Sequence, residues 1–203
     1  SDKTRIAFSA DRLTDYLTGG TCSAMAFEFA HDYLRYRSVL SPEQNFERMG
    51  DKYKSSSKEF RTNQAAFNTI CRDKKHESFD FMRDKIGAML HSYGRSITDV
   101  SEKFYMEVGG PEETQKAEKQ IGSFLEEHPQ GVFVIRCILP EQNDKGEAYG
   151  HSTILIREQG KSYFYDPNEG IVELSSDPKE VVDVLRPMMQ KWIVPYGRIY
   201  KVE

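Results

Sequence analysis

Cysteine is scarce in this chain of 203 residues, and its three copies stand far apart, at positions 22, 71 and 137. An odd number of cysteines at such spacing does not build the disulfide framework of a small secreted domain. No group of cysteines and histidines has the short spacing of a structural zinc site either. We therefore expect a chain that works in a reducing compartment, with no metal and no other cofactor.

Long apolar runs and an excess of positive charge are also missing. No apolar run approaches the roughly 20 residues that a membrane-spanning helix needs. Lys and Arg number 28 against 32 Asp and Glu, which gives a net charge of −4, whereas nucleic-acid-binding domains usually carry a basic face. The chain starts with a serine, so we interpret it as an excised domain or a processed chain. We expect a soluble protein that neither binds nucleic acid nor crosses a membrane.

The first two thirds of the chain are predicted to be mainly helical. Apolar residues recur at helical spacing over 21–36, 59–71 and 79–90. Serine and proline signals start two further helices, over 42–54 and 111–127. The polar run 55–57 is expected to be a loop, and Ile6 to Phe8 a short edge strand.

The last third is rich in β-branched and apolar residues. It predicts strands at 131–139, 151–157, 162–166, 171–174 and 196–202, with a helix from Pro178 to about 189. Short turns between consecutive strands indicate an antiparallel meander. Helices followed by a sheet are typical of the α+β class. We expect a single domain over 1–203, with a helical part over about 1–130 and an antiparallel sheet part over about 131–203.

Cys22 is the first candidate functional residue. It follows Gly19 and Gly20 and precedes an apolar run that starts at Ala24, which places it in the first turn of a helix. Backbone N–H groups there lack intrahelical partners, and the positive end of the helix dipole favours an anion. A thiol in this position is shifted toward its nucleophilic thiolate form. The structural alternative is a buried thiol, which we prefer for Cys137, whereas we interpret Cys71 as a helix-end residue.

A catalytic thiol needs a base, and His151 is the histidine best placed to supply one. It follows Gly150 at the start of an apolar strand, beside a loop. His31 lies nine residues after Cys22, and nine steps of about 100° put it on the opposite face of the helix. The remaining histidines lie in turns or at helix ends, where we expect them to be solvated or unremarkable: His76, His91 and His128.

Asp166 is the candidate that would orient this base. If the strand of His151 turns at Gln159-Gly160, then Asp166 becomes a cross-strand neighbour of His151. Its carboxylate would accept from the imidazole and fix the tautomer and orientation of the ring. Pro167 would end the strand there.

Three short blocks resemble the catalytic blocks of the YopT-type effector cysteine proteases, which belong to the papain-like superfamily. They are Gly20-Thr21-Cys22, Gly150-His151-Ser152 and Tyr165-Asp166-Pro167-Asn168-Glu169-Gly170. Their order and their separations of 129 and 15 residues fit the family, whereas residues 36–130 carry no such likeness. The resemblance implies a papain-like fold, a Cys22–His151–Asp166 triad and a bacterial effector that acts on host proteins.

The chain departs from this pattern just before the nucleophile. Papain-like enzymes usually carry Gln or Asn five or six residues before the cysteine, where its amide donates to the oxyanion. Leu17 and Tyr16 stand at those positions here. Thr18 and Tyr16 are the candidate oxyanion donors, next to the backbone N–H of Cys22. The remaining alternatives are an oxyanion hole made of backbone groups alone, or a different activity.

Three functions stay open at this stage. The first is a cysteine protease that hydrolyses a protein or peptide substrate. The second keeps the thiol chemistry and changes the acceptor, as in deamidases or transglutaminases. The third is a papain-like binding module that retains the triad but acts through residues 36–130, where substrate pockets would also lie.

Overall fold

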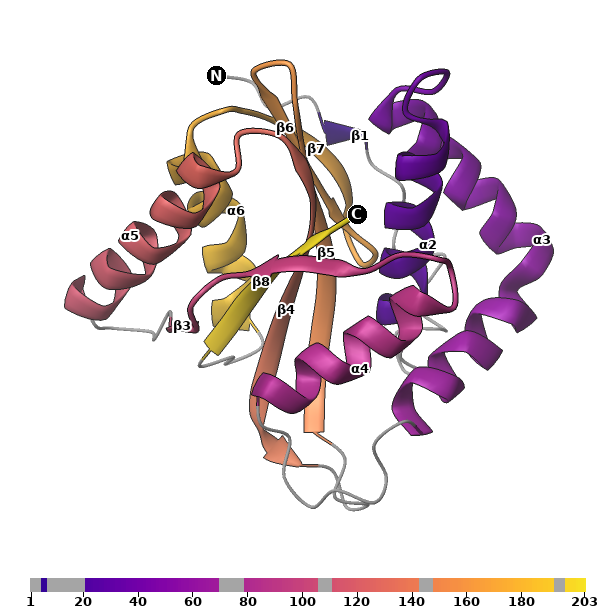
Figure 1. Ribbon diagram of the computed structural model, residues 1–203, viewed down its shortest axis with the longest axis horizontal. Helices are drawn as coiled ribbons and strands as arrows, with labels where there is room; N and C mark the ends of the chain where they lie inside the picture. The colour runs from indigo at the N-terminus through magenta and orange to yellow at the C-terminus, as the bar shows by residue number, and fades with distance from the viewer. Residues whose placement is uncertain (1–4, 7–20, 70–78, 106–110, 143–147, 192–195) are drawn as a thin grey trace.

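The computed structural model describes residues 5–6, 21–69, 79–105, 111–142, 148–191 and 196–203 (Figure 1). The helices are α2 (Cys22–Tyr36), α3 (Pro42–Thr69), α4 (Phe79–His91), α5 (Pro111–Glu127) and α6 (Pro178–Lys191). The strands are β1 (Arg5–Ile6), β2 (Ile97–Val100), β3 (Phe104–Tyr105), β4 (Gly131–Gln142), β5 (Ala148–Glu158), β6 (Lys161–Asp166), β7 (Gly170–Ser175) and β8 (Tyr196–Val202).

Within these residues the strands form one antiparallel sheet in the order β1-β7-β6-β5-β4-β8-β2, and β3 pairs beside β8. The neighbours β4 to β7 are the predicted meander. The turn between β5 and β6 is tight because Gln159 and Gly160 both have positive φ, 49° and 75°. Two such residues form the turn that matches the twist of a hairpin. It fixes a register in which Ile154 faces Tyr165.

Alternation along the strands gives the sheet two apolar faces. Val132, Val134 and Ile154 belong to a core shared with α2, α3 and α4. Phe133 and Leu155, one residue out of phase, belong to a second core shared with α5 and α6. Figure 1 shows the sheet between α2 and α3 on one side and α5 and α6 on the other.

Helix α2 forms where the apolar run predicted it, and it is buried on almost every face. Ala24, Phe27 and Phe29 have at most 1% of their surface exposed. The ring of Phe29 stacks on Tyr165 of β6 with centroids 4.2 Å apart, which fixes the helix against the sheet. None of the described helices is both long and apolar enough to cross a membrane.

The start of α3 also follows its sequence signal. The backbone N–H of Gln44 donates to Oγ of Ser41 over 3.1 Å, and the N–H of Ser41 donates to Oε1 of Gln44 over 2.9 Å. This reciprocal pair is a capping box, which satisfies two free donors of the first turn. The predicted serine cap is therefore confirmed.

One expectation was only partly right, and two strands were missed. Residues 55–57 do not form a separate loop, because α3 runs from Pro42 to Thr69, but Ser56 has non-helical backbone angles (φ −134°, ψ 30°) and kinks the helix within the predicted break. Packing of Tyr53 against Phe60 across the kink, with ring centroids 5.6 Å apart, holds the two halves together. The strands β2 and β3 were not predicted. Both pair with β8, far along the chain, so their partner is not visible from local pattern.

Candidate active site

Cys22 is the first residue of α2 and its side chain is half-buried. The N–H of Ala24, one turn into the helix, donates to Oε1 of the buried Gln64 on α3 over 2.9 Å. Among the described residues, none accepts from the N–H of Cys22 or of Ser23. These two donors therefore remain available to an anion at the helix start.

His151 and Asp166 lie together at neighbouring ends of β5 and β6. Nε2 of His151 is 2.8 Å from Oδ1 of Asp166, and the two side chains are only 8% and 7% exposed. The register of Ile154 with Tyr165 places Asp166 level with Thr153. His151 and Asp166 are therefore diagonal neighbours rather than directly opposite each other, and the diagonal is still within reach of an imidazole.

The turn after Asp166 fixes its carboxylate. Oδ1 accepts from the backbone N–H of Asn168 over 2.8 Å, and the carbonyl of Asp166 accepts from the N–H of Glu169 over 3.0 Å. An aspartate that accepts from the backbone two residues on forms an Asx turn. The carboxylate is thereby held in place where it meets His151.

The thiol of Cys22 is hydrogen-bonded to the imidazole of His151. Nε2 faces Asp166, which leaves Nδ1 for the sulfur. Burial raises the pKa of Cys22, but the hydrogen bond and charge of His151, the charge of Arg136 and the N–H of Ser152 together lower it from 9.0 to about 6. Burial lowers the pKa of His151, whereas the charge and hydrogen bond of Asp166 and the contact with Cys22 raise it to about 10. Between these values the pair is a thiolate and an imidazolium.

Arg136 is a residue of this site that the sequence analysis missed. It lies on β4 directly opposite Ser152 of β5, and only 5% of its surface is exposed. Its Nη1 donates to Oγ of Ser23 and to Oγ of Ser152, both over 3.0 Å. The only available signal was a charged residue inside the apolar run 131–139.

Several candidates from the sequence lie outside the described residues. They include both proposed oxyanion donors, Thr18 and Tyr16, as well as Cys71 and His76. Cys137 of β4 lies in the core shared with α5 and α6, and burial raises the pKa of its thiol to about 12. Its interpretation as a core residue is confirmed.

The other described histidines are engaged elsewhere. Nδ1 of His31 is 3.2 Å from Nε of Arg95, and its ring packs against Tyr93, so it is no partner of Cys22. Burial lowers the pKa of His31. His91 is exposed at the end of α4, where a histidine was expected to be unremarkable.

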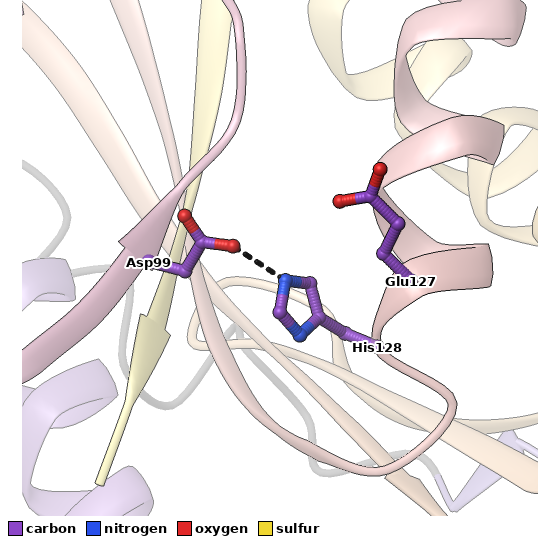
Figure 2. A group of neighbouring side chains, drawn as sticks. All are labelled: Asp99, Glu127 and His128. Atoms are coloured by element: carbon purple, nitrogen blue, oxygen red, sulfur yellow. Dashed lines mark hydrogen bonds and ion pairs between the residues drawn. The ribbon is translucent and has the colours of Figure 1, made fainter.

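His128 is not solvated, contrary to the expectation. Its side chain is 16% exposed, and its Nε2 lies 2.6 Å from Oδ2 of Asp99. Figure 2 shows this contact together with the carboxylate of Glu127, and the three side chains bring one possible ligand atom each within 4.8 Å of one another. Nε2 of His128, the nitrogen that would bind a metal, already contacts the carboxylate of Asp99. The contact joins β2 to the end of α5, and its direct role is to tie these elements together.

No family model matches this chain, and no curated protein matches it in sequence. Among solved structures, the Pseudomonas avirulence protein AvrPphB is similar over 97% of this chain and 95% of its own length, with a TM-score of 0.64 and 15% identity. AvrPphB is a YopT-family effector cysteine protease. The likeness shows that this chain has the same fold along nearly its whole length, and the predicted papain-like α+β fold is confirmed.

Two other solved structures are similar to a lesser degree. PatoxP, a cysteine protease-like domain of a Photorhabdus asymbiotica toxin, matches over 42% of this chain and 27% of its own, with a TM-score of 0.31 and 18% identity. The ubiquitin-specific protease of the murine cytomegalovirus tegument protein M48, solved with a ubiquitin-based suicide substrate, matches over 100% and 85%, with a TM-score of 0.47 and 15% identity.

Proposed function

We propose that this chain is a cysteine protease of the papain-like type, with Cys22 as nucleophile, His151 as base and then acid, and Asp166 as the group that orients the imidazole. The observation that carries the proposal is the hydrogen-bonded series from the Cys22 thiol through His151 to Asp166, at the start of a buried helix. The papain-like fold supports it, because cysteine proteases are among the proteins that share this fold.

The geometry supports a two-step acyl transfer. The Cys22 thiolate attacks the substrate carbonyl carbon, and the negative charge that develops on oxygen is stabilised by the N–H of Cys22, which no described residue accepts. The imidazolium of His151 then gives its Nδ1 proton to the leaving amine, which leaves a thioester on Cys22. In the second step neutral His151 takes a proton from water as that water attacks the thioester, and the thiolate is restored. Asp166 accepts from Nε2 throughout and stays ionised.

The substrate class is a protein or a peptide, since this chemistry acts on amide carbonyls. We further propose a bacterial effector that acts on host proteins. The likeness in fold to an avirulence protein of Pseudomonas supports this role. We keep 1–203 as one catalytic domain, and we propose that the nucleophile helix and the meander together form its active centre.

The test is a comparison of the chain with its Cys22→Ala variant on a complex protein mixture. Labelling of new N-termini followed by mass spectrometry should find cleavage products with the unchanged chain and none with Cys22→Ala. Glutamine side chains converted to glutamate, or joined to amines, would instead assign the deamidase or transglutaminase chemistry and overturn proteolysis. No modification of any kind, together with a Cys22 that reacts no faster than an ordinary thiol, would leave the binding module and overturn the enzyme.

A further inference from the structure

Arg136 is a buried cation whose counter-charge is not an acidic side chain of the described residues. Arg136 lies on β4 beneath α2, and its guanidinium donates to two neutral hydroxyls, those of Ser23 and Ser152. Within the part of the chain that the structure describes, its Nε has no hydrogen-bond partner. Burying a charge is costly unless an opposite charge or a full set of hydrogen bonds compensates it. The buried charge of Arg136 therefore needs a nearby anion to compensate it.

The guanidinium is held firmly in this position. Oγ of Ser23 and Oγ of Ser152 are 3.0 Å apart, and Nη1 bonds both, which closes a triangle of polar contacts. Both serines have no exposed surface. Cζ of Arg136 lies over the ring of Phe67 on α3, 5.4 Å from its centre, which is a cation–π contact.

Both serines are neighbours of the reactive sulfur. Ser23 follows Cys22 in α2, with its Oγ 3.9 Å from Sγ, and the backbone N–H of Ser152 donates to that same sulfur. The charged groups that act on the thiol are His151 of β5 and Arg136 of β4, while Tyr165 of β6 lies nearby as a neutral phenol whose pKa is raised by burial and by the charges of Asp166 and Cys22. The anion that faces Arg136 is then the thiolate itself.

We propose that Arg136 is a positioning residue for the Cys22 thiolate: its charge balances the thiolate, and its Nη1 fixes Ser23 and Ser152 beside the sulfur. The inference rests on the proposed function, because it needs Cys22 to act as an anion. The charge of Arg136 stays the same through the reaction, whereas His151 is neutral in the thioester state and regains its proton only as water attacks. The guanidinium is therefore a constant positive charge near the sulfur, and together with the re-formed imidazolium it favours release of the thioester as thiolate.

The experiment measures the rate at which iodoacetamide alkylates Cys22 as a function of pH, in the full chain and in Arg136→Met. We expect the midpoint of the profile to rise by about one pH unit, which is about a tenfold loss of thiolate at mildly acidic pH. The matched control is Arg157→Met. Arg157 is an equally buried arginine of the same sheet, but it donates to the carbonyls of Leu125, His128 and Ser176 near α5. Its loss should lower stability and leave the midpoint unchanged.

The outcomes separate this inference from the proposed function. A folded Arg136→Met with the midpoint of the unchanged chain overturns the inference, and so does an equal shift in Arg157→Met. A midpoint near 9 in the unchanged chain itself would overturn the proposed function instead. If Arg136→Met does not fold, Arg136→Lys decides. It keeps the charge without the planar fork, so a midpoint near that of the unchanged chain with slower peptide hydrolysis supports the inference, and unchanged hydrolysis overturns it.

Discussion

Gly150 of β5 lies directly against the guanidinium of Arg136: a Cβ at position 150 would stand 2.3 Å from Nη2 and 2.6 Å from Cζ. The Cβ of an alanine at position 150 would therefore collide with the buried guanidinium of Arg136, which hydrogen bonds hold in place. Glycine is therefore needed at position 150 because Arg136 occupies the space of a side chain, and not because the backbone there adopts an unusual conformation.

The first prediction concerns Gly150→Ala. Overpacking of a filled interior costs about 1–3 kcal/mol, so the free energy of unfolding should fall by that amount in denaturant titration. The displaced guanidinium should also raise the midpoint of the Cys22 alkylation profile. The matched control is Gly122→Ala in α5, where a Cβ would meet nothing within 4 Å and where alanine should stabilise the helix by about 0.5–1 kcal/mol. Equal effects of the two variants would contradict the close packing at Gly150.

The second prediction concerns the pH dependence of the unchanged chain. Cys22 must lose its proton and His151 must keep its own, so peptide hydrolysis should rise through pH about 6 and fall through pH about 10. Alkylation of Cys22 should follow the lower limit alone. Cys137, whose pKa is raised to about 12 by burial, should react far more slowly at every pH in this window. Equal alkylation rates at Cys22, Cys71 and Cys137, read by peptide mass spectrometry, would remove the nucleophile assignment.

The third prediction concerns the orientation of the imidazole. His151→Ala should abolish the fast alkylation of Cys22 at neutral pH, because the hydrogen bond and charge that favour the thiolate are gone. Its melting temperature should change little, since Asp166 keeps the N–H of Asn168. Asp166→Asn should retain part of the activity, because an amide still meets the ring but no longer fixes the same tautomer. Full activity in Asp166→Ala would place the orienting group elsewhere.

Much of the fold follows from local sequence signals. The capping pair of Ser41 and Gln44, the tight turn at Gln159-Gly160 and the alternation along β4 each act over a few residues, and each is visible in the sequence. The approach of His151 to Asp166 could be predicted for the same reason, because one hairpin turn fixes both positions.

The rest depends on contacts between distant segments. Arg136 owes its place to Ser23, 113 residues away, and to a ring on α3, so no local pattern marks it as a site residue. The kink at Ser56 does not break α3, because packing of Tyr53 on Phe60 outweighs the weak helix preference of three serines. His128 was expected in solvent, and it is instead tied to Asp99 on a strand that local pattern did not reveal.

The fourth prediction concerns the side chain that completes the oxyanion hole. Thr18→Val and Tyr16→Phe each remove one hydroxyl donor and keep the shape of the side chain. Loss of the true donor should lower kcat by about a hundredfold and leave KM unchanged, because the interaction exists only in the transition state. If neither variant changes kcat in peptide hydrolysis, two backbone N–H groups form the hole, and one of them is the N–H of Cys22, which no described residue accepts.

The fifth prediction concerns Gln64, which reaches from α3 to accept the N–H of Ala24 in the first turn of α2. Gln64→Leu leaves this buried N–H without an acceptor, so the free energy of unfolding should fall by about 1–3 kcal/mol. Gln64→Glu keeps the acceptor and should be closer to the unchanged chain in stability. It also places a negative charge beside the helix start, which disfavours the thiolate and raises the pKa of Cys22. The two variants should therefore have different effects. Gln64→Leu should mainly lower the free energy of unfolding in denaturant titration, whereas Gln64→Glu should mainly raise the midpoint of the Cys22 alkylation profile. A glutamate variant with an unmoved profile would show that position 64 supports the helix without contributing to the charge balance at Cys22.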